Sequence, residues 1–140
     1  MEDDKILEET LIVVKPDAVQ RGLVGKIIAR FEEAGFVIRE ICIVERSRNF
    51  WELFYEEHKN KGFFNNLVEY MLSGEAIAIV FSRQDAILKA RELIGPLPPN
   101  APHGTIRGDY AIDFRRNAVH ASCSQDAFER ERKICFESSI

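Results

Sequence analysis

Apolar residues fall into short runs along the chain, and these runs predict β-strands. Residues 11–14 (LIVV) carry apolar side chains on both faces, which is typical of a strand buried between two layers. Residues 36–44 are again rich in β-branched side chains, but Arg39-Glu40 interrupts them, so we expect a second strand that is bent in its middle. Residues 76–81 (AIAIVF) predict a third strand, and the stretch from Tyr110 to Asp113 predicts a short fourth one.

Between these runs the apolar residues recur at helical spacing. Leu23, Ile27 and Phe31 predict an amphipathic helix that ends at Gly35, because glycine is favoured just after the end of a helix. Two further helical segments, over about 50–58 and 64–72, predict a hairpin of helices before the third strand.

Three pairs of polar residues at capping-box spacing predict where helices begin. The pairs are Asn49 with Glu52, Ser82 with Asp85, and Ser122 with Gln125. The second pair would open a helix that runs to about residue 94, and the third a last helix near 124–136.

The order of these elements predicts an α/β (α+β) fold in a single domain over residues 1–140. Four strands separated by helices suggest a split βαβ sandwich, in which helices cover one face of an antiparallel sheet. Residues 1–8 are polar and lack periodicity, so we expect a loosely ordered lead-in to the first strand. Residues 95–104 hold four of the five prolines, which predicts an extended loop without helix or strand.

Composition limits the classes of function. The three cysteines are scattered and form no CxxC pair, which argues against a disulfide framework or a zinc site and favours a reducing, cytoplasmic location. No apolar run approaches the roughly 20 residues that a membrane helix needs, so no membrane contact is expected. A net charge of −4 gives no general attraction to a polyanion, which argues against nucleic-acid binding.

The clearest candidate for covalent chemistry is His120, in the segment Asn117 to Ser122. It lies between small residues just before a predicted helix start, where free N–H groups favour an anion. A neutral imidazole can attack phosphorus if its other ring nitrogen is fixed by an acceptor. Glu131 in the last helix, with the Ser122 hydroxyl between them, is the expected acceptor. The alternative is that His120 is a structural loop histidine.

Cations and aromatic residues extend this hypothesis. Lys15 directly follows a buried strand, and with Arg91 and Arg107 it would neutralise a transferring phosphoryl group if the three side chains converge. Of the adjacent Phe63 and Phe64, one could expose its ring for stacking on a base while the other enters the core, and Tyr55 could point the same way. Alternatively, the arginines are ordinary surface residues and the aromatic rings belong to the core.

Three stretches together resemble the nucleoside diphosphate kinase family over Glu9 to Glu137. They are TLIVVKPDAVQRGLVGKII, FYEEHKNKGFFNNLVEYMLSG and HGTIRGDYAIDFRRNAVHAS, followed by Glu131 in the final helix. The resemblance implies a ferredoxin-like core and a ping-pong reaction, in which a nucleoside triphosphate such as ATP phosphorylates His120 and a nucleoside diphosphate collects the phosphate. It also implies Mg²⁺ as the cofactor that accompanies the nucleotide, and a homo-oligomer built from dimers, with dimer, tetramer and hexamer all open.

The resemblance also implies a role for each matching residue. His120 would be the nucleophile, supported by Ser122, Glu131 and Tyr55, while Lys15 would bind phosphate and meet the sugar. The expected nucleotide-binding residues are Lys15, Phe63, Arg91, Arg107, Phe114 and Asn117. No protein side chain is expected to bind the metal directly, because the phosphates would hold it.

This chain departs from the family pattern at several positions. Leu97 stands where the family has a threonine that contacts phosphate, and Phe114 stands where a valine or a similar residue packs on the base. Cys123 replaces a common aspartate after the serine, and we expect its oxidation to lower activity. These changes leave two alternatives from other classes, namely a catalytically silent interaction module and a nucleic-acid-binding module.

Overall fold

A computed structural model describes residues 7–44 and 47–137 of the protein, and its centre is a four-stranded antiparallel sheet. The strands are β1 (Glu8–Val14), β2 (Val37–Ile43), β3 (Ile77–Arg83) and β4 (Val119–Ala121). Their order in the sheet is β2-β3-β1-β4, with β1 paired to both β3 and β4. This confirms the predicted fold class, a ferredoxin-like α/β sandwich.

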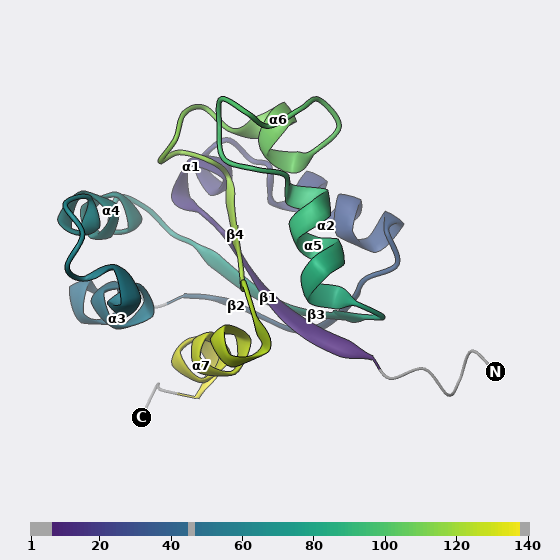
Figure 1. Ribbon diagram of the computed structural model, residues 1–140, viewed down its shortest axis with the longest axis horizontal. Coiled ribbons are helices and arrows are strands. Elements are labelled where there is room, and N and C mark those ends of the chain that lie inside the picture. Colours follow the sequence, from purple (N-terminus) through teal and green to yellow (C-terminus); the bar gives the residue numbers. More distant parts are fainter. Residues whose placement is uncertain (1–6, 45–46, 138–140) are drawn as a thin grey trace.

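Helices connect these strands and cover the sheet (Figure 1). They are α1 (Pro16–Gln20), α2 (Val24–Glu33), α3 (Arg48–Phe54), the 3₁₀ turn η2 (Glu56–His58), α4 (Phe64–Met71), α5 (Ala86–Ile94), α6 (Ile106–Tyr110) and α7 (Gln125–Phe136). In the part of the chain that the structure describes, no helix is both long enough and apolar enough to cross a membrane.

Helices cover both faces of the sheet, so the expectation of one covered face is wrong. In β1, Ile12 and Val14 pack with α2 and α5 on one face, whereas Leu11 and Val13 pack with α3, α4 and α7 on the other. Figure 1 shows these two groups of helices on opposite sides of the sheet. The cause is visible in the sequence, because a strand with apolar side chains on both faces has to be covered on both.

The fourth strand is β4 at Val119–Ala121, and the predicted strand from Tyr110 to Asp113 is wrong. Residues Ile106–Tyr110 form α6 instead, and the hydroxyl of Thr105 caps this helix by accepting from the N–H of Gly108. A strand of three residues is too short to show periodicity. Residues Val119–Ala121 form a strand because they pair with β1.

All three predicted helix caps are wrong, although the helices exist. Ser47 caps α3 and Ser124 caps α7, each accepting from a backbone N–H with its hydroxyl. Ser82 lies inside β3, and it is the Glu8 carboxylate that accepts from the N–H of Ile87 in the first turn of α5. The caps that were not predicted depend on neighbouring or distant residues, which a local capping-box pattern does not identify.

Other local expectations are confirmed. Gly35 follows α2 with φ of 92°, a left-handed conformation that suits glycine after a helix. The pairing of β2 with β3 shifts register between Ile38 and Glu40, where the bend was predicted. Residues 95–104 contain no helix or strand. The predicted loose lead-in over residues 1–8 falls mostly on residues 1–6, outside the described residues, but Glu8 already belongs to β1.

Candidate active site

His120 is the middle residue of β4, opposite Val13 of β1. It therefore lies on a strand, and α7 begins only at Gln125, so the predicted position in a loop directly before a helix is wrong. Its Nε2 lies 3.0 Å from Oε1 of Glu131, the acceptor that the sequence predicts. The strand fixes the backbone of His120, and α7 brings the carboxylate to its ring.

Glu131 is only 2% exposed, and its carboxylate gathers several polar groups. The Ser122 hydroxyl donates to Oε1 over 2.7 Å, and a guanidinium nitrogen of Arg130 lies 3.8 Å from Oε2. Burial opposes the charge of Glu131, but the charge and hydrogen bond of His120 and the Ser122 bond outweigh it, so the pKa is below its ordinary value. Glu131 is an ionised buried acceptor.

An ionised acceptor at Nε2 determines what the other ring nitrogen can do. Because an ionised carboxylate can only accept, Nε2 carries a proton, and in the neutral form of the ring Nδ1 is then the nitrogen with a free lone pair. The His120 side chain is 20% exposed, so Nδ1 is not sealed in the core by complete burial of the residue. Phe54 packs edge-on against the imidazole with ring centroids 5.1 Å apart, and Tyr55 does so at 6.2 Å. These contacts fix the orientation of the ring.

Lys15 follows the last residue of β1, next to the strand that carries His120. Val14 pairs with Val119, so the register places the two segments side by side. Lys15 is 6% exposed, and burial, reinforced by the positive charge of Arg107, lowers its pKa to about 7. Lys15 has no carboxylate partner among the described residues, and such a buried amine favours an incoming anion that restores its charge.

Arg91 and Arg107 reach the same strand from α5 and α6. Arg107 donates to the carbonyls of Gly95 and Val119 over 3.1 and 2.9 Å, and Arg91 donates to the carbonyl of Ala121 over 3.5 Å. The two guanidinium groups thus bind the carbonyls on either side of His120. They also line a pocket of about 140 Å³, and burial together with Arg91 lowers the pKa of Arg107 to about 10.

Several buried polar atoms in this region have no partner within the described residues. They are the Tyr55 hydroxyl, Nε of Arg107 and Oδ1 of Asn117. Burial raises the pKa of Tyr55, so its hydroxyl is a neutral hydrogen-bonding group. Unsatisfied buried groups are costly, and their concentration in three predicted site residues points to a polar ligand.

The two aromatic side chains predicted to hold a base are both exposed. Phe63 is 41% exposed at the start of α4, and its ring centroid lies 5.5 Å from that of His58. Phe114 is 61% exposed, and its carbonyl accepts from the side chain of Asn117 over 2.8 Å. No contact given for the described residues joins the two rings, so the base slot between them stays a prediction.

Four residues that contact the predicted site residues or one another were not singled out from the sequence. They are Asp17, Phe54, His58 and Tyr70. Asp17 follows Lys15-Pro16 directly, and its position just after a buried strand could have identified it as a candidate site residue. The other three come from helices distant in sequence, and only the packing of α3, η2 and α4 brings them to the site.

Two of the positions that depart from the family pattern, Leu97 and Cys123, lie outside this hydrogen-bond network. Leu97 is 38% exposed in the proline-rich loop, and Cys123 is an exposed free thiol between Ser122 and the cap of α7. Neither has a side-chain hydrogen bond given for the described residues. The effect of Cys123 oxidation on activity stays a prediction.

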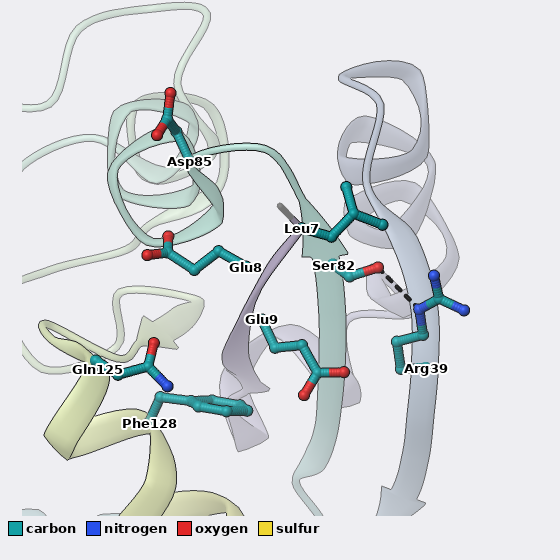
Figure 2. A pocket seen from close by; sticks show the side chains of 8 residues that line it. All are labelled: Leu7, Glu8, Glu9, Arg39, Ser82, Asp85, Gln125 and Phe128. Carbon is teal, nitrogen blue, oxygen red and sulfur yellow. Dashed lines mark hydrogen bonds between the residues drawn. The ribbon is translucent and has the colours of Figure 1, made fainter. Parts of the chain in front are cut away.

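A larger cavity of about 790 Å³ lies elsewhere, beside the beginning of β1. Figure 2 shows the carboxylates of Glu8, Glu9 and Asp85 around it, with Arg39 bound to the Ser82 hydroxyl over 2.8 Å. Acidic side chains repel phosphate, and none of the predicted site residues lines this cavity. Of the two cavities, the smaller one suits an anionic ligand better, because Arg91 and Arg107 line it together with Ala121, the residue after His120.

A histidine bound to a buried carboxylate, with a buried lysine and two arginines beside its strand on a ferredoxin-like sheet, is typical of the site of a phosphoryl-transfer enzyme. The family model described as nucleoside diphosphate kinase matches residues 8–140. The chain is 43% identical over 135 residues to the nucleoside diphosphate kinase of Saccharolobus solfataricus, covering 96% of this chain and 98% of that protein. It is 41% identical over 131 residues to nucleoside diphosphate kinase 1 of Arabidopsis thaliana, covering 93% and 88%.

Solved structures agree with these matches. The Aquifex aeolicus nucleoside diphosphate kinase superposes with a TM-score of 0.86 at 37% identity, covering 95% of this chain and 97% of the other. A halophilic nucleoside diphosphate kinase from Halobacterium salinarum, solved in complex with CDP, gives a TM-score of 0.89 at 38% identity, with coverages of 93% and 88%. The chain belongs to the nucleoside diphosphate kinase family, whose members are phosphotransferases that bind nucleotides and need a divalent cation.

Replacing Glu131 tests the buried network. We expect Glu131→Gln to lower the free energy of unfolding at pH 7 by about 1–3 kcal/mol, because Nε2–H and the Ser122 hydroxyl lose a charged acceptor. The pKa of Glu131 lies below its ordinary value of 4.5, so its stabilising charge is present above that pH and is lost as the pH falls further. Urea unfolding should be measured at pH 7 and at several pH values below 4.5. The difference in free energy of unfolding between wild type and variant should become smaller as the pH falls.

Glu129→Gln is the matched control, since Glu129 lies exposed on the same helix and bonds only to Gln125 among the contacts given. It should change stability by no more than about 0.5 kcal/mol. If Glu131→Gln lowers the free energy of unfolding by the same amount at every pH, Glu131 is not ionised in the folded protein.

Proposed function

We propose that this chain transfers the γ-phosphate of a nucleoside triphosphate to a nucleoside diphosphate through a phosphohistidine on His120. One observation carries the proposal: Nε2 of His120 is bound to buried Glu131, which leaves Nδ1 as the nucleophilic nitrogen. Buried Lys15, which follows β1, and the arginines of α5 and α6 support the same conclusion, because they lie beside the strand that carries this ring.

In the first half-reaction, the lone pair of Nδ1 attacks the γ-phosphorus. The N–P bond forms while the bond from the γ-phosphorus to the bridging oxygen breaks, and the electron pair of that bond stays on the departing nucleoside diphosphate. No proton has to leave Nδ1, because Glu131 keeps the proton on Nε2 and stabilises the charge that the ring acquires. Ser122 holds Glu131 in that orientation.

Lys15, Arg91 and Arg107 act on the phosphoryl group during this transfer. Negative charge moves onto the bridging and equatorial oxygens, and cations already held beside the strand of His120 stabilise it without reorganisation. The Tyr55 hydroxyl and the Asn117 amide oxygen, both buried without partners among the described residues, supply polar contacts to the nucleotide. In the second half-reaction a different diphosphate attacks the phosphohistidine by the reverse of these steps.

The base is proposed to lie between exposed aromatic side chains. Phe63 stacks on it, and Phe114 covers its other face. Stacking accepts any base, since every base has a π-face, so we expect broad nucleotide use.

We propose Mg²⁺ as the divalent cation. The side chains gathered at the site are mainly cationic, and no group of three or more His, Cys, Asp or Glu residues suited to a metal occurs in the described chain. This donor set fits a metal that arrives on the nucleotide, where phosphate oxygens are its preferred hard ligands. When bound, it neutralises part of the phosphate charge.

We further propose a single domain, a cytoplasmic location and an oligomer of at least two chains. The edge strand β2 supports the oligomer, because Val37, Ile41 and Ile43 are 51%, 50% and 64% exposed along it. An exposed apolar edge strand is a ready surface for pairing with a second copy. Light scattering during size-exclusion chromatography should give a mass of at least twice 16.1 kDa, and the mass of one chain would refute the oligomer.

The central test is a labelling experiment. Incubation with γ-labelled ATP and magnesium should give an acid-labile, alkali-stable adduct that a nucleoside diphosphate removes. His120→Ala should abolish it, whereas His103→Ala should not, because the His103 side chain is 99% exposed. An adduct that survives in His120→Ala would refute the mechanism. If the wild type forms no adduct, the result would instead support a catalytically silent interaction module or a nucleic-acid-binding module.

Lys15→Ala tests charge stabilisation. The phosphorylation rate should fall by about 10²–10³, the loss typical of removing a group aimed at transition-state charge. Wild-type kcat/KM should fall as the pH rises above about 7, because Lys15 of the free protein loses its proton there, and Lys15→Ala should lack this step. Lys26→Ala, which removes an exposed lysine of α2, is the control. An unchanged rate in Lys15→Ala would exclude the role.

A further inference from the structure

Asp17 is a buried carboxylate that the proposed mechanism does not use. It is 6% exposed and lies in the first turn of α1, two residues after Lys15. Both of its carboxylate oxygens accept hydrogen bonds from groups that come from distant parts of the chain.

One oxygen of Asp17 binds the segment that leads into β4. Oδ2 accepts from the backbone N–H of Ala118 over 3.2 Å, while the N–H of Lys15 donates to the carbonyl of Ala118 over 2.9 Å. Both backbone polar groups of Ala118 are therefore bound to the Lys15–Asp17 segment. His120 follows only two residues later.

Ala118 needs this restraint because of its backbone conformation. Its φ is 76°, in the left-handed region, which costs a residue with a Cβ of order 1 kcal/mol or more unless surrounding contacts hold it. The left-handed residue turns the chain between Asn117 and β4, so its conformation affects the direction in which His120 enters the sheet.

The other oxygen of Asp17 binds Tyr70 of α4. The Tyr70 hydroxyl donates to Oδ1 and accepts from the N–H of Asp17 over 3.0 Å, so one hydroxyl satisfies both groups. Burial and Asp17 together raise the pKa of Tyr70, which keeps the hydroxyl protonated as a donor. Phe63 is the residue before α4, so this contact joins the helix behind the base-stacking ring to the lysine segment.

We propose that Asp17 is a positioning residue for phosphoryl transfer, held by the Tyr70 hydroxyl, which fixes the Ala118 turn and thereby aligns His120 with Lys15. This inference rests on the proposed function of those two residues.

Rapid-mixing phosphorylation by ATP tests the proposal, because it separates the fraction of competent sites from the rate at each site. We expect Asp17→Asn to slow phosphorylation by about 10–100-fold, since misplacement by an ångström costs about that much. The burst amplitude per folded chain should stay near that of wild type, and the Kd for ADP should change less than about threefold, because the groups that bind phosphate remain.

Tyr70→Phe keeps the carboxylate and removes only its anchor, so we expect a smaller slowing of about 3–10-fold. Ser73→Ala is the matched control. The Ser73 hydroxyl bonds to the carbonyl of Tyr70 over 2.6 Å at the end of the same helix, without contacting Asp17, and its loss should leave the rate within about twofold.

The outcomes separate alignment from simple folding support. If both variants lose amplitude but phosphorylate at the wild-type rate, or if the Kd for ADP weakens in proportion to the rate, Asp17 is not a positioning residue. If Asp17→Asn does not fold, Tyr70→Phe alone decides between these results. Absence of a phosphohistidine in the wild type would instead refute the proposed function, so the two failures are distinguishable.

Discussion

The hydrogen bond between the Glu131 carboxylate and Nε2 of His120 is the interaction on which the site depends. A carboxylate that is 2% exposed is costly to bury, and only its bonds to His120 and Ser122 and the nearby Arg130 charge offset that cost. In return, it fixes the tautomer and the orientation of the imidazole. A ring free to rotate would present either nitrogen, protonated or not, to the substrate.

Helix α7 brings Glu131 to this position, and arginines hold the helix there. Arg132 makes a bidentate ion pair with Glu40 of β2 at 2.8 and 3.0 Å. Arg130 donates to the carbonyls of Leu53 and Phe54 at the end of α3, each over 3.2 Å. The second contact is to Phe54, the residue whose ring packs on His120. The support of the nucleophile therefore comes from the sheet and from the helical hairpin together.

The positively charged side chains beside His120 are also costly to remove from water. Lys15 and Arg107 are buried near one another, and burial lowers both pKa values. Arg107 is compensated in part by two backbone carbonyls, whereas its Nε has no partner among the described residues. A site of desolvated positive charge gives up some stability in the free protein, and a bound phosphate restores it.

The sequence by itself determined most of the helices and strands and identified the candidate residues for the chemistry. The buried strand 11–14, the helix before Gly35 and the proline-rich loop were predictable because propensity and apolar periodicity act over a few neighbouring residues. The pairing of His120 with Glu131 was also predicted, since the two are linked through one short turn and one helix. The family pattern supplied the roles of the cations.

Only the tertiary structure decided how these residues meet. It moved the fourth strand from residues 110–113 to Val119–Ala121, because pairing with β1 defines a strand of three residues. It covered both faces of the sheet and brought Asp17 to Tyr70, 53 residues away. These are contacts between segments far apart in the chain. Their energy comes from burial and from satisfying polar groups after packing, which no local pattern encodes.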